Sequence, residues 1–251
     1  MKQLYFYVAA TLEDIFRRFQ KEHSFATQLG EFEKKNAIHL HETHAAIGIL
    51  EMLRLLIDLH DVNWQNAWNS MNHTFTCAMY NIKESQMEKW PVDLFGALLP
   101  RHLEILNSIN FMLIEKVKKY FPPEEHQERI KRISIFDDST TPKMIRMSNL
   151  CLVACHKITF CSEMQYKILF EEQDSLFRDF PLFLPQKCFM LIPNGGNPRR
   201  WIYNANRKLA DLITEENKDE SEWLVDLRHL ESFVRYTEDI GFLQRFLEIR
   251  A

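Results

Sequence analysis

The chain has 251 residues, of which 46% are hydrophobic and 26% charged, and its formal net charge is −4. This length is enough for one large domain or two modest domains with a full core. The slight negative charge gives no general attraction for nucleic acid or for anionic membranes. Only 6 glycines occur, well below the average of roughly 7%, which disfavours glycine-rich phosphate loops and favours helices.

Cysteine usage and hydropathy favour a cytoplasmic location. The five cysteines are an odd number without framework spacing, so we expect reduced intracellular thiols. The apolar run at residues 4–10 leads directly into Thr11-Leu12-Glu13-Asp14, which is typical of a helix start and not of a signal peptide. No apolar run approaches the roughly 18 residues that span a bilayer, so we expect no membrane partner.

Hydrophobic periodicity predicts helices and one strand in the first half of the chain. The spacing indicates amphipathic helices over residues 12–19, 43–59, 64–79 and 100–120, and a short buried strand over residues 37–40. Thr43 is placed to cap the second of these helices. The helix over residues 100–120 is expected to end before Pro122 and Pro123, because proline cannot continue a helix.

The second half of the chain contains the best candidate for a domain boundary. Residues 144–168 are expected to form a helix whose thiols are mostly buried. Four prolines and a Gly195-Gly196 pair within residues 180–198 mark the boundary. Beyond it, the periodicity predicts three amphipathic helices, over residues 206–216, 221–236 and 238–250.

Two clusters have the residue types of metal ligands. His39 and His41 lie on one side of the predicted strand, and His44 follows at the next helix. Together they are either a zinc site or partly exposed imidazoles at a corner, and the imperfect spacing favours the corner. Cys151 and Cys155 share one helix face while Cys161 lies well round from it, so core packing is the better interpretation and no metal site is predicted.

Two basic segments could bind anions. Arg17 and Arg18 could grip a phosphate through forked hydrogen bonds, or could simply form a solvated helix face. The loop at residues 194–200, with sequence NGGNPRR, offers amides and cations to a sugar or an anion, but such loops also join domains. No nucleophile motif, Walker motif or dinucleotide glycine pattern occurs.

Six segments in order resemble one family. They are VAATLEDIFRRF (residues 8–19), AIHLHETHAAIGILEMLR (37–54), WQNAW (64–68), WPVDLFGALLPRHLEI (90–105), NLCLVACH (149–156) and NPRRW (197–201). Each motif is modest alone, but six in register are specific. The chain resembles the middle of an α-glucan (glycogen/starch) phosphorylase.

The resemblance implies a fold, an activity and partners. Phosphorylases have the α/β GT-B architecture, in which two Rossmann-like domains close over pyridoxal phosphate. They form homodimers and phosphorolyse α-1,4-glucan to glucose 1-phosphate. Residues 1–190 resemble the second half of the N-terminal domain and residues 191–251 the start of the C-terminal one, so we expect a mostly helical, incomplete piece of that fold.

No segment resembles the part that carries the cofactor lysine. We therefore expect these 251 residues to be inactive by themselves. The alternative is a non-catalytic pseudoenzyme that binds glucan or a phosphorylase subunit.

Site residues follow position by position from the same resemblance. Arg17 and Arg18 match an arginine pair that binds nucleotide phosphate, so AMP or phosphate is a possible partner. His44 and Asn194 match residues of the sugar site, although Glu42 and His41 replace a family aspartate and asparagine. Tyr80 stands where the family has a histidine whose backbone carbonyl contacts the sugar, and Phe160 replaces a glycine near the active site.

The resemblance also predicts part of a glucan-storage surface. Asn110, Asp138 and Lys143 lie at or near its polar positions. Asn107 and Phe111 depart from the tyrosine and glutamine of the family.

Overall fold

The computed structural model describes residues 1–172, 174–184, 189–193, 195–197, 199–217 and 222–250. The packing of the chain divides it into two compact units, Met1–Pro193 and Asn194–Ala251. This division lies within the proline-rich segment 180–198 that the sequence indicates as a boundary.

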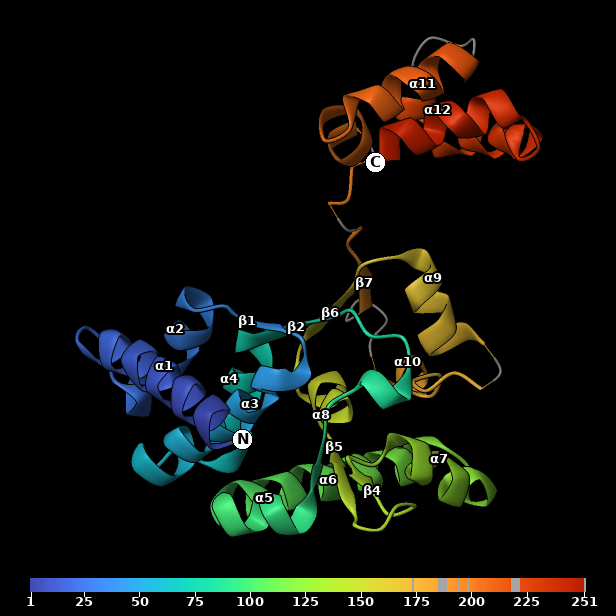
Figure 1. Ribbon diagram of the computed structural model, residues 1–251. Helices are drawn as coiled ribbons and strands as arrows, with labels where there is room; N and C mark the ends of the chain where they lie inside the picture. Colours follow the sequence, from blue (N-terminus) through green and yellow to red (C-terminus); the bar gives the residue numbers. More distant parts are fainter. Residues whose placement is uncertain (173, 185–188, 194, 198, 218–221, 251) are drawn as a thin grey trace. The chain divides into compact units, whose positions relative to one another are not determined.

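A four-stranded parallel sheet runs through the first unit (Figure 1). Its strands are β1 (Ile38–His41), β2 (Phe75–Met79), β6 (Lys157–Phe160) and β7 (Phe189–Leu191), and they pair in that order. In the register, Leu40 lies beside Cys77, Cys77 beside Ile158, and Ile158 beside Phe189. The central strand β2 is almost entirely buried, as expected for a parallel strand with both faces covered.

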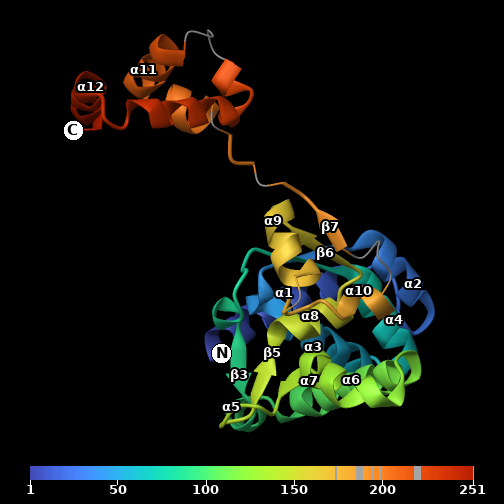
Figure 2. The same cartoon turned by 90° about the vertical axis from the view of Figure 1, so that its right-hand side faces the viewer.

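Helices make up most of this unit and cover the sheet. Figures 1 and 2 both show α3, α4 and α8 beneath the strands. The helices of the unit are α1 (Lys2–Gln20), α2 (Phe25–Lys35), α3 (Ile47–Arg54), α4 (Trp64–Thr74), α5 (Val92–Leu98), α6 (Pro100–Tyr120), α7 (His126–Ile133), α8 (Met147–Ala154), α9 (Glu163–Tyr166) and α10 (Phe180–Phe183). Shorter 3₁₀ or π segments include η1 (Thr43–Ala46), η2 (Leu55–Leu59) and η5 (Lys167–Glu171).

A second, antiparallel sheet is held together by the buried side chain of Asp137. Its strands pair in the order β3 (Lys89–Pro91), β5 (Met144–Arg146) and β4 (Phe136–Asp137). Asp137 is buried, and its carboxylate accepts from Ser139 Oγ at 2.6 Å and pairs with Arg146 Nη2 at 2.9 Å and Lys89 Nζ at 3.2 Å. These partners hold the pKa of Asp137 well below its usual range against the opposing effect of burial.

Several predicted elements are confirmed and others are wrong. The strand near residues 37–40 and the helix over residues 100–120 are present as β1 and α6. The helix predicted from residue 12 begins at Lys2, and Thr11 lies inside it, with Oγ1 bonded to the Tyr7 carbonyl at 2.7 Å instead of capping. The segments 64–79 and 144–168 are not single helices, because β2 occupies Phe75–Met79 and β6 occupies Lys157–Phe160.

The second unit has a small core of its own. Ala210, Ile213 and Trp223 are buried together, and Trp223 Nε1 donates to Thr214 Oγ1 at 3.1 Å. The described residues of this unit form no strand. They form the helical segments η7 (Arg199–Asn204), α11 (Arg207–Asn217), η8 (Glu222–Leu224), η9 (Leu227–Tyr236) and α12 (Ile240–Arg250). The segment predicted as a helix over residues 221–236 is thus largely 3₁₀.

Within the described parts of both units, no helix combines the length and the apolar character that crossing a bilayer requires.

Candidate functional site at the carboxyl edge of the parallel sheet

Glu42 directly follows β1 and has a strained backbone. Its φ is 66° and its ψ is 174°, a region that is essentially restricted to glycine and costs roughly 1–3 kcal/mol for other residues. Its carboxylate accepts from Tyr80 N at 2.8 Å and from Asn81 Nδ2 at 3.2 Å. The strained residue thereby fastens the end of β1 to the segment that leaves β2. Strain of this kind gathers at functional sites.

Gln165 holds the same segment from the side of β6. It is 2% exposed, and its Nε2 donates to Met79 O at 2.8 Å and to Asn81 O at 3.3 Å. Its Oε1 accepts from Cys161 N at 2.9 Å. The amide therefore joins the carboxyl ends of β2 and β6. No residue pattern in the sequence indicated Gln165, because its partners are backbone groups distant in the chain.

Between these two side chains, the Tyr80 carbonyl is left free. The carbonyls of Met79 and Asn81 on either side accept from Gln165, whereas the Tyr80 oxygen has no partner among the residues that the structure describes. A held backbone segment with one free acceptor is suited to receive a hydroxyl hydrogen bond.

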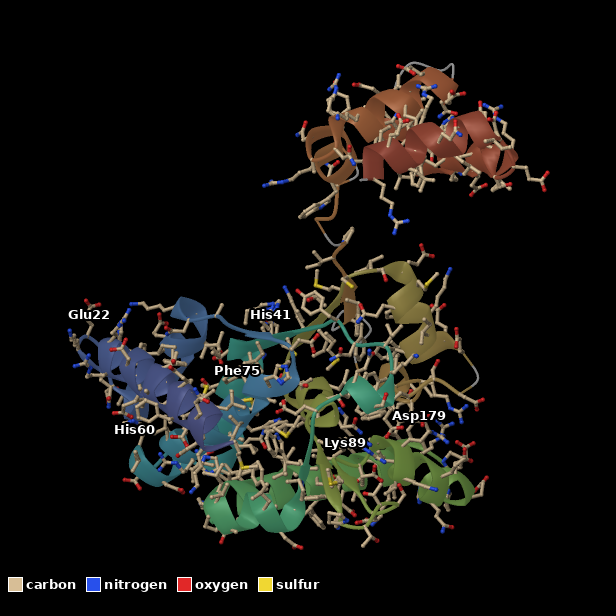
Figure 3. The ribbon with its side chains drawn as sticks, in the orientation of Figure 1. Glu22, His41, His60, Phe75, Lys89 and Asp179 are labelled. Atoms are coloured by element: carbon tan, nitrogen blue, oxygen red, sulfur yellow. The ribbon has the colours of Figure 1, made fainter. Side chains whose placement is uncertain are left out.

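The histidines near this edge point to separate partners. The His41 ring, labelled in Figure 3, lies 5.0 Å from the Tyr80 ring, centroid to centroid. His44 is exposed, and its Nδ1 lies 3.0 Å from Glu88 Oε2. His39 Nδ1 lies 2.7 Å from Thr76 Oγ1. Among the described residues, no group of three or more His, Cys, Asp or Glu side chains is arranged to hold a metal ion.

The sequence predicted two other positions at or near the sugar site. Asn194, the second predicted sugar-site residue, lies outside the described residues. Phe160, at the end of β6, is 1% exposed and packs edge-on against Phe170 at 5.1 Å. Its side chain therefore fills the core and does not extend into the edge.

The two predicted phosphate-binding arginines share one carboxylate. Arg17 Nη2 lies 2.9 Å from Asp14 Oδ1, and Arg18 also pairs with Asp14. Both guanidinium groups remain largely exposed at the end of α1, with 71% and 75% of the side chains accessible. The two arginines lower the pKa of Asp14.

The three predicted storage-surface residues are not equivalent. Asn110 is buried, and its Oδ1 accepts from Ile135 N at 2.8 Å and Ser134 Oγ at 3.1 Å. Asp138 and Lys143 are exposed and form an ion pair of 2.6 Å. Asn110 thus holds the segment that leads into β4, while the other two are accessible to a ligand.

The cysteines of the second cluster are core residues. Cys77, Cys151 and Cys155 are buried, and Cys151 interacts with the thiols of both others. The interaction with Cys151 and burial raise the pKa of Cys77, the interaction with Cys155 and burial raise that of Cys151, and burial raises that of Cys155. Raised thiol pKa values indicate poor nucleophiles. Cys161 is half-buried, and Cys188 lies outside the described residues.

Comparisons with known proteins give a consistent family. Glycogen phosphorylase of Saccharomyces cerevisiae is 38% identical over 251 residues, which is all of this chain and 27% of that protein. Glycogen phosphorylase of Chlamydia trachomatis is 35% identical over 250 residues, and the human brain form is 35% identical over 256 residues. The chain covers 29% of each of these two proteins, and so spans less than a third of its curated relatives.

The family model described as "Carbohydrate phosphorylase" matches residues 1–251 of this chain. The mostly helical unit with its parallel sheet is compatible with part of such a protein. The chain belongs to the carbohydrate phosphorylase family.

Proposed function

We propose that this chain is the part of an α-1,4-glucan phosphorylase that forms one wall of the glucosyl site. The reaction transfers a terminal glucosyl unit to inorganic phosphate and releases glucose 1-phosphate. The observation that carries the proposal is strained Glu42, whose carboxylate holds residues 80 and 81 at the carboxyl edge of a parallel sheet. Ligands of open α/β sheets bind at this edge.

The role of these residues is to orient the sugar. The Tyr80 carbonyl accepts a hydrogen bond from a glucosyl hydroxyl, while Glu42 and Gln165 hold its direction. A backbone acceptor does not depend on the side chain, so tyrosine in place of the family histidine leaves this contact available. His44, anchored by Glu88 at 3.0 Å, borders the same edge. Preorganised contacts of this kind contribute to catalysis by positioning.

Pyridoxal phosphate, the cofactor of the family, does not fit the lysines described. A Schiff-base lysine is activated by desolvation in an apolar pocket or by a neighbouring cation that lowers its pKa. Every described lysine except Lys89 is exposed, and Lys89 is held by Glu84 at 2.6 Å and Asp137 at 3.2 Å. We therefore assign no cofactor step to residues of this chain. The same proposal includes glucan as the substrate, assembly as a homodimer, and binding of a nucleotide phosphate at Arg17 and Arg18.

A chimeric enzyme tests the proposal. The matching segment of the yeast phosphorylase is replaced by this chain, and glucose 1-phosphate release from glycogen is measured. We expect activity in the chimera, a large loss of kcat with Glu42→Gln, and recovery with Glu42→Asp, which restores the residue of the family. Glu42→Gly separates the effect of the backbone strain from that of the carboxylate hydrogen bonds, because glycine relieves the strain but cannot form these bonds. A folded chimera without activity, or full activity with Glu42→Gln, would contradict the proposal.

A non-catalytic glucan-binding role is the second candidate, and one surface favours it. Phe111 is 66% exposed on α6, beside Asn107 and Trp64 at a hollow of about 540 Å³. An exposed aromatic ring next to an amide suits stacking and hydrogen bonding with a sugar. Maltoheptaose binding that is lost with Phe111→Ala, together with an inactive chimera, would favour this role over catalysis.

A further inference from the structure

One cavity of the first unit lies away from Glu42. Its volume is about 840 Å³, and it lies at the amino ends of β6 and β7, between α4, α6 and α8. Residues at the start of β6 and β7 line it, whereas Glu42 and Tyr80 follow the carboxyl ends of β1 and β2. The cavity is therefore separate from the proposed glucosyl site.

The walls of this cavity are mainly apolar. Leu113, Leu152 and Phe183 are buried residues of its lining, and Trp68 and Val153 are half-buried. Cavities of roughly 300–1,000 Å³ with apolar walls and a few placed polar groups are typical small-molecule sites. Its size and lining suit a ligand with a flat aromatic or short aliphatic body.

The charged side chains among the described lining residues are all basic. Lys116 and Lys157 are exposed at the cavity, and no Asp or Glu is among its described lining residues. Neither ammonium forms an ion pair with another described residue. Lys116 Nζ lies 5.7 Å from the centroid of the Phe183 ring, which keeps the charge close to the apolar wall.

A histidine adds a fixed polar group. His156 Nδ1 lies 3.1 Å from the Asn72 carbonyl oxygen, and since a carbonyl can only accept, Nδ1 carries the hydrogen. Nε2 is then the second polar atom of the ring. Asn72 is held in turn by its bond to the Ala154 carbonyl at 2.6 Å.

We infer that this cavity binds a small amphipathic organic acid, an aryl or short aliphatic carboxylate. The apolar body is buried against Trp68, Leu113 and Phe183, and the carboxylate lies between Lys116 and Lys157. A neutral ligand would leave both cations without a counter-charge, and a free inorganic anion would leave the apolar walls uncovered.

Calorimetric titration of the 251-residue chain with 1-naphthoate tests the inference. 1-Naphthalenemethanol, a neutral analogue of similar shape, is titrated in parallel. We expect 1:1 binding of the acid, at least tenfold weaker binding of the alcohol, and at least tenfold weaker binding of the acid by Lys116→Ala/Lys157→Ala. The matched control is Lys118→Ala/Lys119→Ala, which removes two cations of the same helix outside the lining and should leave the affinity unchanged.

A second variant fills the cavity. Val153→Trp should abolish binding of both ligands. Circular dichroism checks that this variant stays folded. If Val153→Trp unfolds, Leu184→Trp, which fills the cavity from another wall, is used instead. Equal affinity for the acid and the alcohol would overturn the inference. So would unchanged binding in the filled variant, or no heat at millimolar 1-naphthoate with folded wild-type chain.

Discussion

Glu51→Gln should destabilise the first unit strongly, because Glu51 joins three helices. Glu51 on α3 is 2% exposed, and its carboxylate pairs with Arg54 Nε at 2.8 Å and with His102 Nε2 of α6 at 2.7 Å. Tyr5 OH of α1 donates to it at 3.3 Å. Glutamine keeps the shape but leaves the guanidinium of Arg54 without its buried counter-charge.

The expected cost is about 3 kcal/mol, by two separate arguments. Hydrogen bonds from Arg54 and His102 outweigh the opposing effect of burial and lower the pKa of Glu51 from 4.5 to about 2. At about 1.4 kcal/mol per unit, that shift corresponds to roughly 3 kcal/mol. Removing one partner of a buried pair costs about 3–5 kcal/mol. For a chain of this size, the midpoint of thermal unfolding should fall by about 6–12 °C.

The stabilisation by the Glu51 carboxylate depends on pH. Because the folded pKa is depressed, the carboxylate stabilises the protein above the unfolded pKa of 4.5, and this stability is lost as the pH falls toward about 2. Urea unfolding followed by tryptophan fluorescence should show a large difference between wild type and Glu51→Gln at pH 7 that shrinks below pH 4.5.

Glu115→Gln is the matched control for this measurement. It removes an exposed ion pair with Lys118 at 2.8 Å, which should change stability by less than about 1 kcal/mol. A difference for Glu51→Gln no larger than that of the control, or one independent of pH, would refute the reasoning.

Three further predictions follow from the sites. The 251-residue chain by itself should release no glucose 1-phosphate from glycogen and phosphate, and should show no absorbance of bound pyridoxal phosphate; cofactor-dependent release would contradict this. AMP should bind weakly and in a salt-sensitive manner at Arg17 and Arg18, so equal binding by Arg17→Ala/Arg18→Ala in a titration would exclude that site. Iodoacetamide should label Cys77, Cys151 and Cys155 only in denaturant, because they are buried and their pKa values are raised; mass spectrometry showing rapid native labelling would count against this.

Local sequence patterns were sufficient to predict features of the structure whose physical cause is itself local. Helix α6 begins at Pro100 and ends at Tyr120, because proline suits the first helical turn and Pro122 cannot continue a helix. The family resemblance likewise depends only on ordered motifs, and the whole chain matches that family. The exposed arginine pair on α1 could also be expected from the amphipathic spacing of that helix.

The strands β2 and β6 could not be predicted in this way. Periodicity does not distinguish a short apolar run in a strand from one in a buried helix. Parallel pairing decides the matter for Phe75–Met79, because its partners at residues 38–41 and 157–160 are distant in the chain. The same pairing brings Glu42, Tyr80 and Gln165 together.

The candidate site is therefore a product of tertiary structure. The sequence by itself determined the family, the helices with clear ends and the chemical types of the residues near residue 42. Only the tertiary structure decided that Asn110 is buried, that Gln165 reaches the end of β2, and that Glu42 adopts a conformation typical of glycine. Each of these depends on hydrogen bonds between segments far apart in the chain, for which local sequence patterns carry no signal.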